Sequence, residues 1–268
     1  EEDEILVGLM LEELCDFVVD VQEAHPMAFG PMLAPFLKLF ANQLFPIDDG
    51  THNNNSSNVG VGVLDQLRRH VQTSHGRTNT SLRRPPDFVI VAALQFMAHV
   101  TSCSEYSPDP NTNEALAALQ SETDSGRTIT ARGDAIPVDL ATIQAVVHTV
   151  WVEFFTPSTF LDLLLVTIGG YMTLSPVDSI DTWQEDPESY FWQHQTEGSS
   201  SSSNHDLTLA AEQLYCALAE GQPATWIPHL VQLLGLGVTQ RDAASNVTSK
   251  DRVLWDSIYL ATGLSSNL

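Results

Sequence analysis

Five acidic residues lie close together beyond the middle of the chain, and a group of carboxylates can bind a basic peptide or a metal ion. They are Asp178, Asp181, Glu185, Asp186 and Glu188. The first three follow at i, i+3 and i+7, so a helix that begins at Ser175-Pro176 would carry them on one face. The segment lacks the glycine turn of a calcium loop, which disfavours a metal. We expect the group to bind a segment rich in Lys and Arg; a solvated acidic face without a partner is the alternative.

The charge of the whole chain favours the same kind of partner. Its 268 residues include 34 Asp and Glu against 11 Lys and Arg, a formal net charge of −23. No Lys or Arg occurs between Arg132 and Arg241, whereas five arginines lie in a basic stretch at 64–84. A surface this negative repels phosphate backbones and anionic lipid headgroups, so we expect no direct binding to nucleic acid or to a membrane.

The sequence contains none of the common motifs for catalysis, metal binding or cofactor binding. The histidines form no HExxH, and Cys15, Cys103 and Cys216 are far apart, as in proteins of a reducing compartment. Neither GxG sequence has the third glycine of a dinucleotide loop, and GxxxxGK[ST] and GxSxG do not occur. The sequence therefore predicts a protein that is not an enzyme and binds no metal or cofactor.

Helical periodicity runs through most of the chain. Helices are predicted at roughly 3–23, 30–45, 87–104, 138–155, 157–171, 206–220, 224–236 and 249–264, and loops at 46–63, 72–86, 104–137 and 193–205. In the first helix, the core-facing stripe is predicted to be Val7, Met10, Leu11, Leu14, Phe17, Val18 and Val21. Thr156-Pro157 is typical of a helix start, and no convincing strand pair is found.

This pattern predicts an all-α fold. Long polar loops between helices suit an α-solenoid of HEAT-like antiparallel helix pairs, with about four repeats forming one array over residues 1–268. The most apolar stretch, Phe160 to Leu174, is too short to cross a membrane and contains Asp162. The chain opens on Glu1 without Met and directly in a helical pattern, so we expect it to be a portion of a longer protein.

Two helix starts follow each other closely in the segment 171–191. Ser175-Pro176 and Asp186-Pro187-Glu188 each place a capping residue before proline, which predicts a sharp structural corner at Pro187 with Trp183 packed beneath it. The segment resembles the Tyr-x-x-Leu-Thr/Ser-x-x-Asp-Leu-Glu-x-Trp-x-x-Asp-Pro-Glu-x-Phe pattern of the karyopherin-β (importin-β) superfamily, most like its importin-eleven branch. One extra residue separates Leu174 from Trp183, so Asp178 and Ser179 compete for the family's Asp position.

Further segments are similar to this family in the same order along the chain. They are Phe154-Phe155-Thr156-Pro157, Ala210-Ala211-Glu212-Gln213-Leu214, Pro223 to Leu234, and Val253 to Gly263. The resemblance covers about residues 86–264. It implies a HEAT superhelix from the middle of a nuclear transport receptor that shuttles between nucleus and cytoplasm.

The resemblance also implies partners. Such receptors bind cargo, here basic protein cargo at the five acids, and contact phenylalanine-glycine nucleoporins. They respond to the Ran GTPase through the full-length receptor, whose main Ran-binding region is not matched in this chain. An exportin-type receptor and a HEAT-repeat scaffold without a transport role are the alternatives.

Overall fold

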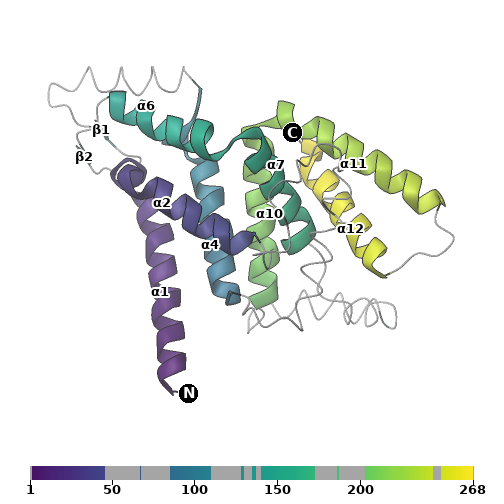
Figure 1. Cartoon of the computed structure of the whole chain (residues 1–268), viewed down its shortest axis with the longest axis horizontal. Helices are drawn as coiled ribbons and strands as arrows, with labels where there is room; N and C mark the ends of the chain where they lie inside the picture. Colours follow the sequence, from purple (N-terminus) through teal and green to yellow (C-terminus); the bar gives the residue numbers. More distant parts are fainter. Residues whose placement is uncertain are drawn as a thin grey trace, which may run out of the picture.

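Helices make up nearly all of the part of the chain that the computed structural model describes, which is residues 2–45, 67, 85–109, 128–129, 135–136, 140–172, 186, 203–243 and 249–267 (Figure 1). Within these residues the α-helices are α1 (Glu2–Ala24), α2 (Pro26–Leu44), α4 (Asp87–Ser102), α6 (Leu140–His148), α7 (Pro157–Val166), α10 (Ser203–Gly221), α11 (Pro223–Ala243) and α12 (Ser249–Leu264). Each predicted helical segment overlaps one of them, and the predicted helical character of the fold is confirmed.

Shorter helical segments extend or follow four of these helices. Two are 3₁₀ turns, η2 (Ser104–Tyr106) and η5 (Ser265–Asn267). The other two are π-helical, η3 (Thr149–Phe154) after α6 and η4 (Thr167–Tyr171) after α7. Their wider turns are closed by i→i+5 hydrogen bonds, from Phe155 N to Val150 O at 2.8 Å and from Met172 N to Thr167 O at 2.9 Å. Such turns are rare and often mark functional positions.

The described residues also include one very short strand pair. The strands β1 (Thr128–Ile129) and β2 (Ala135–Ile136) form a small antiparallel pair. In it, Thr128 lies opposite Ile136 and Ile129 opposite Ala135. Both lie in the segment 104–137 that was predicted to be a loop. Strands of two residues are too short to show the alternation of side chains that reveals a strand in a sequence.

Prolines mark the helix starts largely as predicted. Thr156 caps α7, because its hydroxyl oxygen accepts a hydrogen bond from Thr159 N at 3.3 Å and Pro157 takes the first helical position. The helix predicted at 30–45 instead begins at Pro26 and continues through Pro31 and Pro35. Both inner prolines are on the exposed side of α2, while the opposite side is buried, and that burial offsets the lost backbone hydrogen bonds.

The described helices stack in two layers. In the first, α4 lies between α1 and α10 and packs most extensively against α10 (Figure 1). The C-terminal ends of these three helices lie together. His99 Nδ1 of α4 is 3.8 Å from Glu23 Oε2 of α1, and a methyl group at Gly221 of α10 would lie 3.4 Å from Thr101 Cγ2 of α4. The three helices therefore run in the same direction.

The second layer is formed by α2, by α7 with η4, and by α12. The Tyr171 hydroxyl of η4 donates a hydrogen bond to the Leu44 carbonyl at the end of α2, at 2.8 Å, and η4 also packs against α10 and α12. Between the layers lies one continuous apolar core. The apolar stripe of α4 is fully inside it, with five side chains at the spacing of one helix face: Ile90, Ala93, Leu94, Met97 and Val100.

The core face predicted for α1 was wrong in its N-terminal part. Val7, Met10, Leu14 and Phe17 are exposed, each by more than half of its surface. The buried side chains of α1 are instead Cys15, Val18, Val19 and Gln22, at i, i+3, i+4 and i+7. One reason is that α1 extends past the ends of its neighbours, so that its C-terminal half alone meets α2 and α4 (Figure 1). Within that half, the side with Cys15, Val18 and Val19 faces the protein, and Phe17 lies outside it. Periodicity identifies an apolar face but not the element that covers it.

Candidate functional site

Most of the predicted acidic group lies outside the described residues. This applies to Asp178, Asp181, Glu185 and Glu188, and also to the corner residues Trp183 and Pro187. Asp186 is described, and its side chain is exposed. The grouping of the five acids and the corner therefore stay predictions, and the site that the structure itself offers lies elsewhere.

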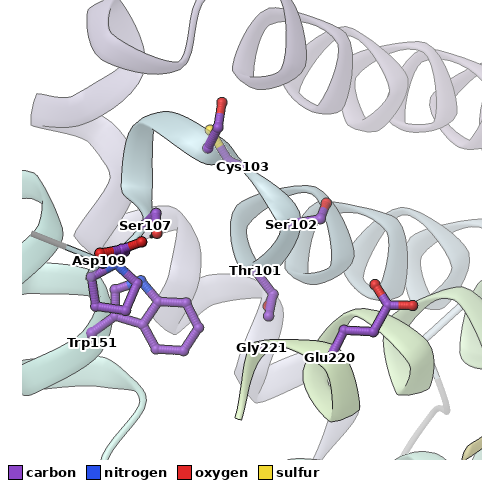
Figure 2. Close-up of a pocket in the computed structure, with 10 residues that line it drawn as sticks. Thr101, Ser102, Cys103, Ser107, Asp109, Trp151, Glu220 and Gly221 are labelled. Carbon is purple, nitrogen blue, oxygen red and sulfur yellow. Dashed lines mark hydrogen bonds between the residues drawn. The ribbon is translucent and has the colours of Figure 1, made fainter. Parts of the chain in front are cut away.

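A surface pocket of about 470 Å³ lies where the C-terminal ends of α4 and α10 meet η3 (Figure 2). Its volume is within the range of pockets that bind small molecules or single side chains. The wall is built from three parts of the chain that are distant in sequence. The residues that line it are Thr101, Ser102, Cys103, Ser104, Ser107, Pro108, Asp109, Trp151, Glu220 and Gly221.

Trp151 is the largest side chain in the wall and is held firmly. Its indole N–H donates a hydrogen bond to the Tyr106 carbonyl at 2.6 Å, and its ring packs on Phe155 with the centroids 5.2 Å apart. The π-helical turn of η3 carries the ring toward the end of α10, where a methyl group at Gly221 would lie 3.4 Å from the Trp151 Cη2. Glycine at position 221 thus lets α10 approach the ring closely.

Two carboxylates line the pocket together with this ring. Figure 2 shows Asp109 beside Trp151 and Glu220 on the opposite side of the pocket, near Ser102. Both acidic residues are exposed. An aromatic face attracts cations through its quadrupole, and two nearby carboxylates add to this attraction. The pocket is therefore suited to a positively charged group.

The cysteine of the pocket is not suited to covalent chemistry. Burial, and to a lesser extent the neighbouring charge of Glu105, together raise the pKa of the Cys103 thiol to about 12. The thiol donates a hydrogen bond to Glu105 Oε2 at 3.4 Å, and the Ser104 hydroxyl donates to the same oxygen at 2.8 Å. Because the thiolate is the nucleophilic form, a thiol protonated at neutral pH is inert. The chemistry that these residues offer is binding.

Sequence reasoning missed this pocket. Its wall comes from residues 101–109, 151 and 220–221, which meet because α4 packs against α10. One signal pointed toward it: Glu220 is the last acid of the stretch without Lys or Arg that begins after Arg132.

Within the described ranges, no three His, Cys, Asp or Glu side chains are grouped so that they could hold a metal ion. No single helix in this part of the chain is long and apolar enough to span a membrane. Residues Ala141–Phe154 and Pro157–Tyr171 meet that test only as a pair, and they are bent by 69° at the break between them.

Comparisons of the chain with protein-family models, with curated proteins and with solved structures found no match. The similarity to karyopherin-β receptors accordingly rests on the sequence segments described above.

Proposed function

We propose that the chain is a segment of a nuclear transport receptor of importin type, built as a HEAT-like solenoid, that binds basic protein cargo. Its architecture supports the solenoid. A repeat that stacks by translation keeps equivalent helices parallel, and α1, α4 and α10 run in the same direction in one layer. The helices α2 and α7 with η4 lie in the other layer, linked by the Tyr171 hydroxyl.

The pocket beside Trp151 is the observation that carries the binding function. A lysine or arginine side chain that entered it would meet the indole face together with the carboxylates of Glu220 and Asp109. A cation on an indole face contributes about 0.5–2 kcal/mol. One side chain thus gives weak binding, and useful affinity requires a peptide whose other basic residues reach further acids of this surface. A basic cargo segment has that form.

Charge supports the same partner over a longer range. Of the described helices, α1, α4, α6, α7 and α10 contain no Lys or Arg at all. A surface with charges of one sign raises the association rate of an oppositely charged ligand, and added salt weakens this effect. The predicted cargo-binding acids, Asp178 to Glu188, lie in the same stretch without Lys or Arg and belong to the proposal as a second contact region.

A direct binding measurement tests the pocket. The probe is a fluorescein-labelled peptide rich in Lys and Arg, titrated with the full chain and followed by fluorescence anisotropy. Glu220→Lys should weaken binding about tenfold, because it places a cation where the ligand's cation would lie. The matched control is Glu153→Lys, the same change of net charge on η3 at an exposed residue that does not line the pocket. Equal effects of the two variants would remove the pocket from the binding site.

Two further experiments separate the alternatives for the whole protein. Binding to phenylalanine-glycine repeats distinguishes a transport receptor from a HEAT-repeat scaffold, which has no reason to bind them. Ran-GTP added to a cargo complex of the full-length protein distinguishes an importin from an exportin, because it releases cargo from the first and tightens cargo binding to the second. A receptor of either kind would shuttle between nucleus and cytoplasm.

A further inference from the structure

Helix α1 exposes an unusual amount of apolar surface. Met10 is 64% exposed, Val7 63%, Phe17 62% and Leu14 56%. Leu6, Leu9 and Leu11 add to this surface. Single exposed apolar side chains are normal, but a continuous group on one helix marks an interaction site. This α1 face, defined by Leu6, Val7, Met10, Leu14 and Phe17, is independent of the pocket beside Trp151 and goes beyond the proposed function.

The three sides of α1 have different characters. One side, with Cys15, Val18, Val19 and Gln22, is buried against the protein. The α1 face lies next to it. Along the other border of the α1 face run Glu13 and Asp20, which alternate with Met10 and Phe17 at spacings of three and four residues. The result is an apolar stripe fixed in place on one side and bordered by acids on the other.

We propose that the α1 face binds an amphipathic helix of a partner protein whose apolar stripe is bordered by Lys and Arg. An exposed apolar stripe on a rigid helix pairs well with a second helix, because side chains at i, i+3, i+4 and i+7 interlock. The stretch from Leu6 to Phe17 is about 17 Å long at 1.5 Å per residue, so a partner helix of about three turns covers it.

Charge selects the partner. Within Glu2–Ala24, α1 contains no Lys or Arg, and its acids include Glu12, Glu13, Asp16 and Asp20, all exposed. A partner helix with basic borders meets these acids with opposite charge. A second copy of this chain would bring two such acidic borders together, and each copy already has a formal net charge of −23. Self-association through the α1 face is therefore disfavoured.

The test uses a designed peptide and the full chain. The probe is an 18-residue peptide with Leu at i, i+3, i+4 and i+7 and Lys at the other positions. One control peptide has the same composition in scrambled order, and another has Glu in place of Lys. By fluorescence anisotropy, the Leu/Lys helix should bind at least about tenfold more tightly than either control, because only it offers both the apolar stripe and the positive border.

Matched variants locate the binding. Phe17→Ser should weaken binding of the Leu/Lys peptide about tenfold or more, because a buried aromatic contact is lost. Val231→Ser on α11, where the valine is also 63% exposed, should leave the affinity unchanged. Met10→Ser provides a second variant on the α1 face. Circular dichroism of each variant confirms that the helices are retained, as expected for changes at exposed positions.

A charge exchange completes the test. The double variant Glu13→Lys/Asp20→Lys should prefer the Leu/Glu peptide over the Leu/Lys peptide. The proposal is overturned if the scrambled peptide binds as well as the helix, or if Phe17→Ser and Val231→Ser have equal effects. It is also overturned if sedimentation shows a dimer that Phe17→Ser dissociates, since a second copy would then be the occupant. A longer form of the protein that continues before Glu1 and does not bind the Leu/Lys peptide would overturn it too, since a preceding repeat would then cover the α1 face. Glu220→Lys, in the pocket beside Trp151, should leave the affinity for the Leu/Lys peptide unchanged. This proposal and the proposed cargo binding at the pocket can therefore be refuted separately.

Discussion

Three buried tyrosine hydroxyls join parts of the described chain that are distant in sequence. Tyr106 donates a hydrogen bond to the Pro26 carbonyl, Tyr171 to that of Leu44 at 2.8 Å, and Tyr215 to that of Ala261 at 2.9 Å. Leu44 and Ala261 belong to the last turns of α2 and α12, where carbonyls have no partner within the α-helix. Each hydroxyl ties two helical elements together, and those of Tyr171 and Tyr215 also satisfy carbonyls at helix ends.

Tyr106→Phe should lower the free energy of unfolding by about 1–2 kcal/mol near neutral pH, because the buried hydrogen bond to the Pro26 carbonyl is lost. Urea unfolding followed by circular dichroism measures the change. A variant as stable as the original chain would show that solvent replaces the hydroxyl without cost.

The same tyrosine should make stability depend on alkaline pH. Burial raises the pKa of Tyr106 above its ordinary value of 10, so the folded state favours the neutral phenol. Below pH 10 the phenol is neutral in both the folded and the unfolded state, and the folded state keeps its full stability. Above pH 10 the unfolded state loses the proton first, so the free energy of unfolding decreases by up to about 1.4 kcal/mol per pH unit. When the free energy of unfolding is measured at pH 8, 10 and 11, it should therefore decrease less steeply with pH for Tyr106→Phe than for the original chain. Identical slopes would contradict the assignment.

At the scale of elements, α2 and α6 approach each other closely at one glycine. A methyl group at Gly30 would lie 2.8 Å from Val146 Cγ2, which is too close for two carbon atoms. Val146 is buried and cannot move aside freely. A glycine inside α2 is explained by this contact, because any larger side chain at position 30 would meet Val146.

Gly30→Ala and Gly235→Ala form a matched pair of helix substitutions. Gly235 lies within α11 and has no atom near the position of an added methyl group, so alanine there should stabilise the chain by up to about 1 kcal/mol. At Gly30 the same gain is opposed by an overlap that costs about 1–3 kcal/mol. Thermal unfolding should give a higher Tm for Gly235→Ala and a lower or unchanged Tm for Gly30→Ala. A similar increase in both would show that α6 can shift.

Helices were the part of this protein that the sequence predicted best. The stripe in α4 and the cap at Thr156 depend on neighbours within a few turns, and local spacing reveals them. The exposed face of α1 and the pocket beside Trp151 depend on which helices meet, and side-chain spacing within a helix does not contain that information. The acidic group at 178–188 was predicted from charge and spacing, and its arrangement in space lies outside the described residues.

At the scale of the whole molecule, α4 joins elements from both ends of the described chain. It packs against α1, α2 and α10, and Phe96 lies within a cluster of rings, 4.8 Å from Phe40 and 5.8 Å from Phe29 between centroids. Such a central helix couples its neighbours, so the described core should unfold as one unit rather than helix by helix.

Phe96→Ala should lower the free energy of unfolding by about 3–5 kcal/mol, because the side chain is fully buried and leaves a cavity. Leu39→Ala on the exposed side of α2 is the control and should change stability by about 0.5 kcal/mol or less. Hydrogen exchange should show the slowest amides in α4 and α10 and faster exchange in the N-terminal turns of α1. Early exchange of α4 ahead of α1 would contradict its central role.

The packing of α4 against α10 also has a consequence for synthesis. The last residue of α4 is Ser102 and the first of α10 is Ser203, so about a hundred residues are added to the growing chain between them. At roughly 5–20 residues per second this takes on the order of ten seconds. During that time the apolar side of α4 has left the ribosome without the helix that will cover it. Nascent chains that end before Ser203 are therefore where chaperones should bind, and crosslinking on stalled ribosomes would detect them.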